Sequence, residues 1–348
     1  MILINGRFLT QRLTGVHRFA YELCCALVRQ GVEIKVIAPR DIRPEYHCPF
    51  PVVTTCGKGS HGWEQWILPL YIHRHFPGQW LLSLTGLCPI LYNRNILTIH
   101  DVAYLKNPHW YSRAYYWFYR IMTPLAAARS AEILTVSLFS RDELVKYMHL
   151  DSKHIHIVYN AVNTEPLGHI QPSERPYILS VCTLDPRKNL SRLLEAYSRI
   201  ENRDFDLYLV GGSNSVFQTP ELSQYRHMKG VRFLGYIGDD EQLGTLYRNA
   251  LAFVSPSLYE GFGIPNLEAM YRSCPLVVSD IPVYHEICGP AALYMNPMDI
   301  DDMCRSISRI AGDAELRQQL IVAGSEQVKR FDWDTSARNV LSILNSYE

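Results

Sequence analysis

Short apolar runs recur along this 348-residue chain, separated by stretches with helical periodicity or by polar loops. Residues 2–4 form the first run, and a helix is expected at 16–29 because apolar side chains recur at positions 16, 19, 20, 23 and 27. Later runs predict strands at residues 32–38, 96–99, 133–136, 155–158, 178–181, 207–210, 231–235, 251–254 and 276–279. Helices are expected at 115–128, 239–249 and 331–348, whereas 39–64 has no periodicity and predicts loops and edge structure. Alternating strands and helices predict an α/β fold with parallel sheets covered on both faces.

The length predicts two domains, each large enough to bury its own core. Prolines at 166, 172 and 176 indicate a linker at residues 164–176. We therefore expect an N-terminal domain at 1–165, a second domain at 166–330, and a terminal helix at 331–348.

Composition narrows the class of protein. Lys and Arg total 34, as do Asp and Glu, so no global charge points to nucleic acid. Residues 1–165 carry 17 basic and 11 acidic side chains (+6), and the remainder carries 17 and 23 (−6). The basic half could rest on an anionic membrane or hold an anionic acceptor, but chance scatter explains the asymmetry equally well.

The cysteines and the apolar runs predict the cellular location of the protein. Nine cysteines lie scattered, without a C-x2-C pair or zinc spacing, which indicates reduced thiols. No apolar run reaches the roughly 18–20 residues that span a bilayer, and MILINGRFLT is typical of a strand and loop, not a signal peptide. We expect a cytoplasmic protein, with peripheral contact with the inner face of the cytoplasmic membrane left open.

Candidate chemistry is concentrated in residues 255–270, SPSLYEGFGIPNLEAM. Pro265 stands where a helix would begin, and the open N–H groups there, beside Gly261 and Gly263, make a seat for phosphate. Glu260 in the loop and Glu268, expected in the first helical turn, bracket that seat and can accept hydrogen bonds from sugar hydroxyls. The pattern favours a phosphorylated sugar. Two alternatives stay open, because Glu268 could only favour the positive helix end and Glu260 could be a solvated loop acid.

Glu260 and Glu268 are separated by seven residues, which include Gly261-Phe262-Gly263 and Pro265, and resemble the E-x7-E signature of retaining glycosyltransferases of family 4. The resemblance implies two Rossmann-like, doubly wound parallel-sheet domains that face each other across a cleft, the GT-B architecture. It also implies an acceptor-side N-terminal domain, a C-terminal domain that binds the nucleotide sugar, and a terminal helix that returns to the N-terminal domain.

The same resemblance implies roles in the second domain. Glu260 would bind sugar hydroxyls, Glu268 the ribose, and Arg187 with Lys188, in the loop DPRKN, the diphosphate. Fixed cations there would stabilise the charge on the leaving group, although a solvated Arg-Lys turn is the alternative. The rest of the donor site would comprise Tyr236, Gly261, Phe262, Gly263, Ile264 and Pro265. Many relatives have an arginine where this chain has Cys182, which leaves open how much of the diphosphate binding Arg187 provides.

In the first domain, Gly15 of LTGVHRFAYEL matches the family's loop under the donor diphosphate, although turn chemistry alone would also explain it. His100, at the end of the strand at 96–99, matches the histidine that reaches the transferred sugar and counts with Glu260, Arg187 and Lys188 as catalytic. The alternative is an Asp101 cap with His100 satisfied locally. Trp110, Tyr111 and Arg113 lie in an aromatic and basic stretch and are candidates for acceptor or membrane contact.

The resemblance implies a retaining hexosyl transfer in which a donor phosphate oxygen accepts the proton, so no carboxylate base is needed. It favours GDP-mannose as donor, with a saccharide or lipid-linked saccharide as acceptor in bacterial cell-surface polysaccharide synthesis. We expect no cofactor and no metal, because Asp204-x-Asp206 and Asp332-x-Asp334 do not lie at the ligand-facing end of a strand.

Three other functions are alternatives to glycosyl transfer. A nicotinamide dehydrogenase needs G-x-G-x-x-G after an early strand, and GFGIPN lacks the last glycine and lies late in the chain. A sugar-nucleotide epimerase of the same architecture and a non-catalytic nucleotide-sugar-binding module both remain alternatives.

Overall fold

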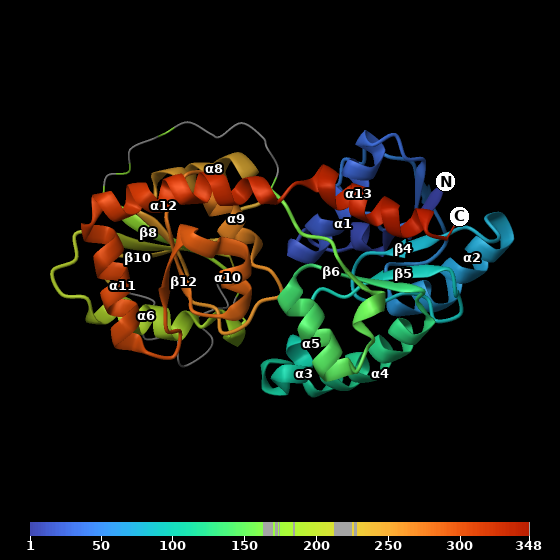
Figure 1. Ribbon diagram of the computed structural model, residues 1–348, viewed down its shortest axis with the longest axis horizontal. Helices are drawn as coiled ribbons and strands as arrows, with labels where there is room; N and C mark the ends of the chain where they lie inside the picture. Colours follow the sequence, from blue (N-terminus) through green and yellow to red (C-terminus); the bar gives the residue numbers. More distant parts are fainter. Residues whose placement is uncertain are drawn as a thin grey trace. The chain divides into compact units, whose positions relative to one another are not determined.

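The structure is a computed structural model that describes residues 1–162, 170, 173, 175–183, 185–211, 225 and 228–347. The chain forms two compact units, Met1–Asn160 with Phe331–Glu348 and Ala161–Arg330 (Figure 1). The linker predicted at 164–176 and the boundary predicted between 165 and 166 fall largely outside the described residues.

Seven parallel strands form the sheet of the first unit, in the order β3-β2-β1-β4-β5-β6-β7. They are β1 (Ile2–Asn5), β2 (Ile34–Ala38), β3 (Val52–Thr54), β4 (Leu81–Ser83), β5 (Asn95–Thr98), β6 (Glu132–Thr135) and β7 (Ile155–Ile157). The strand order reverses between β1 and β4. In open α/β sheets a ligand binds beyond the carboxyl ends of the strands at such a switch point.

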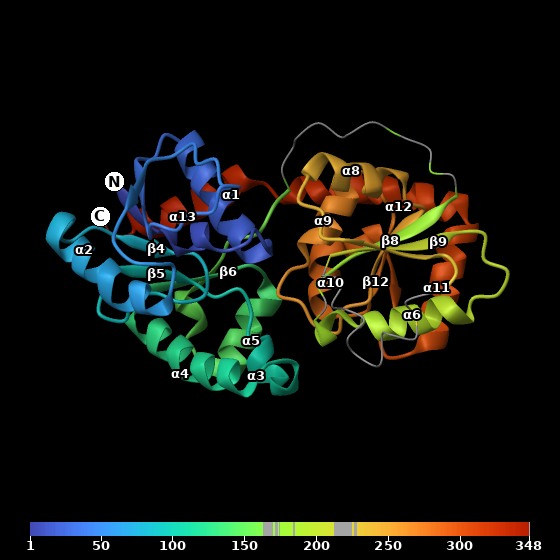
Figure 2. The ribbon, with the colours of Figure 1, turned by 180° about the vertical axis from the view of Figure 1, so that it is seen from behind.

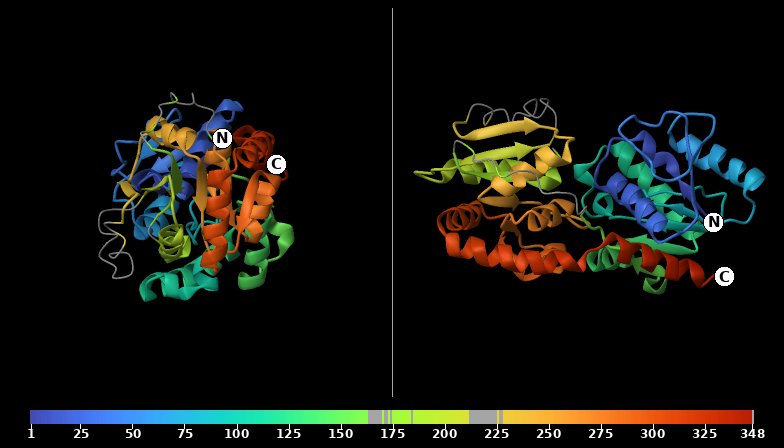
Figure 3. Two further views of the ribbon diagram at one scale, coloured as in Figure 1. Left: turned by 90° about the vertical axis from the view of Figure 1, so that its left-hand side faces the viewer. Right: turned by 90° about the horizontal axis from the view of Figure 1, so that it is seen from above.

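Helices cover both faces of this sheet. They are α1 (Gly15–Arg29), α2 (Leu68–His75), α3 (Ala103–Lys106), α4 (Arg113–Arg129), α5 (Leu138–Met148) and α13 (Trp333–Asn345). Helices α1 and α13 lie on one face and α4 and α5 on the other (Figures 1 and 2). The last helix, α13, lies beside α1 (Figure 3). Asp334, at the start of α13, forms a 2.9 Å ion pair with Arg29 of α1.

The second unit repeats the same plan with six parallel strands, in the order β10-β9-β8-β11-β12-β13. They are β8 (Tyr177–Val181), β9 (Asp206–Val210), β10 (Val231–Gly235), β11 (Ala252–Ser255), β12 (Leu276–Ser279) and β13 (Ala292–Met295). The switch point of this sheet lies between β8 and β11.

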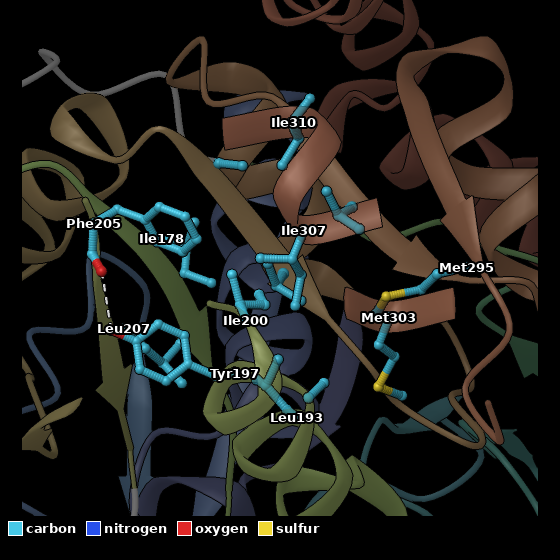
Figure 4. Close-up of a cluster of buried hydrophobic side chains, with 14 of the residues drawn as sticks. Ile178, Leu193, Tyr197, Ile200, Phe205, Leu207, Met295, Met303, Ile307 and Ile310 are labelled. Carbon is cyan, nitrogen blue, oxygen red and sulfur yellow. Dashed lines mark hydrogen bonds between the residues drawn. The ribbon is translucent and has the colours of Figure 1, made fainter. Parts of the chain in front are cut away.

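The helices of the second unit are α6 (Leu190–Arg199), α8 (Asp240–Asn249), α9 (Ile264–Tyr271), α10 (Pro282–Cys288), α11 (Ile300–Gly312) and α12 (Ala314–Gln327). Helices α6 and α11 pack together over the sheet, and their apolar side chains form a hydrophobic core with Ile178 of β8 (Figure 4). Within that core the hydroxyl of Tyr197 is not left unpaired, because it donates a 2.9 Å hydrogen bond to the carbonyl oxygen of Phe205.

The predicted fold class is confirmed, since both units are doubly wound parallel α/β sheets. Strand β4 and helix α2 were not predicted, because β4 has only three residues and the pattern around it is apolar without a clear period. No helix in the described part of the chain is both long and apolar enough to cross a membrane.

Candidate active site

The loop after β8 is held in place by its own side chains. Asp185 Oδ1 accepts a 3.0 Å hydrogen bond from the backbone N–H of Arg187 and so fixes a single 3₁₀ turn. Asn189 ends that turn in the left-handed conformation, with φ of 58°, and its side chain is buried. Its amide donates to the carbonyl oxygens of Pro256 (3.1 Å) and Pro297 (2.7 Å). The basic loop is thereby tied to the loop that follows β11, across the switch point of the sheet.

Glu260 is the centre of the site. Its side chain is buried, with 8% of the residue exposed, and it forms a hydrogen-bonded ion pair with Lys188. Arg187 Nη1 lies 3.6 Å from the other carboxylate oxygen, and Ser257 Oγ donates a 2.9 Å hydrogen bond. A backbone hydrogen bond of 2.8 Å from Leu258 N to Arg187 O locks the two loops together.

The charges in this group balance. Burial raises the pKa of Glu260, but the charges of Lys188 and Arg187 outweigh it and hold the pKa below its ordinary value. Glu260 is therefore ionised at neutral pH. Because Asp185 Oδ2 also lies 3.5 Å from Arg187 Nε, two cations face two carboxylates at the carboxyl edge of the sheet.

Cys182 lies at the end of β8 beside this group. Burial raises the pKa of its thiol to about 11, so the thiol is neutral and adds no charge at neutral pH. The positive charge of the loop therefore rests on Arg187 and Lys188.

Helix α9 begins four residues after Glu260 in the sequence. Gly263 precedes it with φ of 95°, and a Cβ there would lie 2.7 Å from the ring of Tyr284, so only glycine fits. Ile264 and Pro265 open the helix. Pro265 has no N–H to donate, and the N–H of Asn266 donates a 3.0 Å hydrogen bond to the carbonyl oxygen of Gly263. Gly261 and Phe262 are both buried in that loop.

Glu268 is the fifth residue of α9 and so begins the second turn. The first turn of the helix contains no acidic residue, so the expectation that Glu268 belongs to it is wrong. Its Oε2 atom accepts a 3.0 Å hydrogen bond from the hydroxyl of Tyr247, which is buried in α8. The guanidinium of Arg272 lies 5.7 Å from the Tyr247 ring centroid. These contacts fix the carboxylate of Glu268.

The remaining donor-side candidates lie in different places. Tyr236 follows β10 and is exposed. Gly15 is the first residue of α1, in the first unit. His100 follows β5, and its Nε2 lies 2.9 Å from the carbonyl oxygen of Leu84, so that nitrogen carries the proton. Burial lowers the pKa of His100, which leaves the imidazole neutral at neutral pH.

The acceptor-side candidates all lie at the start of α4. Trp110 ends a short 3₁₀ turn, Arg113 is the exposed first residue of α4, and the ring of Tyr111 stacks on Tyr115 at 5.0 Å. The structure thus brings Arg187, Lys188 and Glu260 into direct contact in the second unit. Gly15, His100 and the acceptor-side candidates belong to the first unit.

Sequence reasoning missed Ser257, Tyr247 and the role of Asn189. Asn189 was within reach, because it directly follows the basic pair and asparagine tolerates the left-handed conformation. No sequence signal pointed to Tyr247, which lies 21 residues before its partner Glu268.

Comparison with known proteins adds independent findings. Residues 13–166 match the family model described as Glycosyltransferase Family 4, and residues 165–327 match Glycosyl transferases group 1. The chain is 32% identical over 255 residues to the O-antigen chain mannosyltransferase RfbU of Salmonella typhimurium, covering 72% of this chain and 69% of that protein. It is 30% identical over 275 residues to the O-antigen chain mannosyltransferase B of Escherichia coli, covering 73% and 70%.

A solved structure shares the fold. The sucrose-phosphate synthase of Thermosynechococcus elongatus superposes with a TM-score of 0.77 at 19% identity, covering 99% of this chain and 98% of that one.

Proposed function

The chain belongs to the glycosyltransferases of family 4 and group 1, and on that premise we propose that it transfers a hexosyl group from a nucleotide-diphosphate sugar to a saccharide or lipid-linked saccharide. The names of its relatives favour a mannosyl group, hence GDP-mannose as donor, and a role in O-antigen or other cell-surface polysaccharide synthesis.

The observation that carries the proposal is the buried group of Glu260, Lys188 and Arg187. Its two cations lie at the switch point of the second sheet, next to the N-terminus of α9. A nucleotide diphosphate fits this chemistry, because its phosphates need fixed positive charge and backbone N–H groups.

We assign the steps of the reaction as follows. The bond between the anomeric carbon and the phosphate oxygen breaks, and the acceptor oxygen bonds to that carbon on the same face. The acceptor proton passes to the departing phosphate oxygen. Lys188 and Arg187 stabilise the charge that develops on this oxygen, and a single such contact is typically worth about 2.7–4 kcal/mol in the transition state. Glu260 holds the sugar hydroxyls and both cations in position.

The proposal extends to the absence of a metal requirement. In many phosphate-transfer sites a divalent cation neutralises the leaving group, whereas here Lys188 and Arg187 supply that charge. The transfer therefore proceeds without added cation.

A transfer assay tests the proposal. Purified protein is incubated with GDP-mannose and a panel of octyl glycosides, and products are identified by mass spectrometry and NMR. A new mannosyl glycoside with an α-linkage supports it. Release of an isomeric nucleotide sugar without acceptor would identify an epimerase. Binding of GDP-mannose without any turnover would identify a non-catalytic module.

We further propose that the first unit contacts the membrane peripherally through α4. Trp117, Ile121 and Leu125, one turn apart on the helix, are 57%, 56% and 47% exposed. Helix α4 contains three arginines and no acidic residue. An exposed apolar stripe with basic neighbours suits an anionic bilayer surface, where a lipid-linked acceptor would be presented.

A further inference from the structure

A buried polar cluster lies at the switch point of the first sheet, and the proposed reaction leaves it without a role. Asn5 ends β1, and its side-chain amide donates a 2.7 Å hydrogen bond to Glu64 Oε1. The same amide lies 3.5 Å from Ser83 Oγ, at the end of β4. Glu64 therefore stands at the carboxyl edge of the sheet, between the two strands where a ligand is expected. Its side chain is 0% exposed.

Glu64 also faces two basic side chains. Its Oε2 atom lies 3.4 Å from Arg7 Nε and 3.5 Å from His61 Nδ1. Among the described residues, none of these three atoms makes a hydrogen bond. Buried charged groups are normally hydrogen-bonded, and binding sites without ligand often show contacts that tighten when the ligand arrives.

The backbone that carries Glu64 is unusual. Residues Trp63–Ile67 form a π-helical turn, a rare conformation that is found disproportionately at functional sites. It aims the Glu64 carboxylate at the end of β1, while the side chain of His61 stays 35% exposed and that of Arg7 12% exposed. Arg7 and His61 are thus the members of the cluster that can reach a ligand.

A row of aromatic rings leads away from the cluster. The ring of His61 lies 4.6 Å from Phe118 and 6.0 Å from Tyr119. Tyr119 lies 4.3 Å from Tyr115, which stacks on Tyr111 at 5.0 Å. Flat rings beside hydrogen-bonding groups suit a pyranose, which has apolar C–H faces and polar edges.

The cluster also lies near His100. Burial lowers the pKa of His17 to about 4, and the His100 imidazole and the Arg7 guanidinium both add to the lowering. The ring of His100 packs edge to face against the ring of Phe19, which belongs to α1 as His17 does, and the two ring centroids are 5.0 Å apart. Arg7 and His100 therefore both lie within electrostatic range of His17, near the start of α1.

We propose that Arg7 and His61 bind the hydroxyl groups of the acceptor saccharide, with Glu64 as the positioning residue behind them. This assignment rests on the proposed glycosyl transfer. One carboxylate facing one guanidinium leaves no net charge, so the subsite suits neutral sugar hydroxyls and not phosphate. Glu64 draws both donors toward the edge of the sheet, and the rings from Phe118 to Tyr111 pack against the sugar face.

Saturation-transfer NMR titration with octyl glycosides, and separately with GDP-mannose, tests the assignment. We expect Arg7→Lys and His61→Ala each to weaken saccharide binding at least 10-fold and to leave GDP-mannose binding unchanged. Glu64→Gln should do the same, since the new side-chain amide would present an N–H donor to Arg7 in place of an acceptor oxygen. Glu132→Gln is the matched control, because Glu132 is also a buried acid but lies at the amino edge, at the start of β6.

The outcomes separate this subsite from the proposed function. Unchanged saccharide binding in Arg7→Lys and His61→Ala would overturn the subsite even if Glu64→Gln unfolds. A parallel loss in Glu132→Gln would show a general effect of the fold and would also overturn it. Wild-type protein that binds octyl glycosides through these residues but binds no nucleotide sugar would contradict the proposed transfer and leave the saccharide subsite standing.

Discussion

The hydroxyl of Tyr247 donates a 3.0 Å hydrogen bond to the carboxylate of Glu268, from one helix of the second unit to the next. Tyr247 is completely buried, so its hydroxyl is not in contact with solvent. A buried donor committed to one carboxylate oxygen orients the other oxygen. The proposed ribose contact of Glu268 therefore depends on a residue that touches no substrate.

Tyr247→Phe is expected to raise the KM for the nucleotide sugar about 10-fold with little change in kcat. A hydrogen bond to a charged group contributes about 1.5–3 kcal/mol, and here it supports donor binding and not the chemical step. Steady-state kinetics with varied donor provide the measurement. Tyr197→Phe removes an equally buried hydroxyl from the core of the same unit and is the control. A similar KM in both variants would contradict the prediction.

Lys188→Ala is expected to lower kcat by about 10²–10³, the typical loss when one contact to developing charge is removed. The far-ultraviolet circular dichroism spectrum should be unchanged, since both loops keep their backbone hydrogen bonds. Lys329→Ala, which breaks an exposed ion pair in the same unit, is the control. Near-normal turnover by Lys188→Ala would remove the basis of the site assignment.

The stability of Glu260 variants separates structural from catalytic roles. Glu260→Ala leaves two cations beside a buried gap and should lower the free energy of unfolding by about 3–5 kcal/mol. In the double variant Lys188→Met/Glu260→Leu, apolar side chains replace the buried pair, so stability should largely return while transfer stays abolished. Urea denaturation and the transfer assay measure the two effects. Recovery of activity together with stability would show that the pair serves only the fold.

The pH dependence of stability follows from the lowered pKa of Glu260. A carboxylate whose pKa is lower in the folded state stabilises the protein above its unfolded pKa, near 4.5, and this contribution is lost as pH falls through the folded pKa. The difference in unfolding free energy between wild type and Glu260→Gln should therefore be largest near neutrality and shrink below pH 4.5. A difference that does not change with pH would be inconsistent with this account.

Full transfer activity is expected in excess EDTA, because Lys188 and Arg187 supply the charge that a metal would. The measurement compares initial rates in chelator with rates in added magnesium or manganese. A strict requirement for either cation would refute the proposed metal-free mechanism.

Trp117→Ser/Ile121→Ser is expected to reduce co-sedimentation with phosphatidylglycerol vesicles severalfold, since burial of large apolar side chains drives interfacial binding. Phosphatidylcholine vesicles should bind weakly even with wild type, because they offer α4 no negative charge. Val322→Ser, which removes an exposed apolar side chain from α12, is the control. Unchanged binding by the double variant would contradict a membrane role for this face, and a loss of self-association instead would identify it as a contact between copies.

The success of sequence reasoning depended on the range of the interactions involved. The strands β1, β8 and β11 could be predicted, because an apolar run between polar loops is a local signal. The acids at 260 and 268 and the basic pair at 187 and 188 were identified by short motifs. One local prediction failed, because α9 begins at Ile264 and not at Pro265, so Glu268 falls in the second turn.

The sequence by itself determined the α/β class with parallel sheets, the two-domain scale and the residues that carry charge near each strand end, since these follow from periodicity and spacing. Only the tertiary structure decided which of them meet. Lys188 and Glu260 are 72 positions apart, Tyr247 and Glu268 are 21 apart, and Asn5 and Glu64 are 59 apart. Each of these contacts depends on strand order and helix packing, which bring distant segments to one edge of a sheet, and no local pattern encodes that neighbourhood.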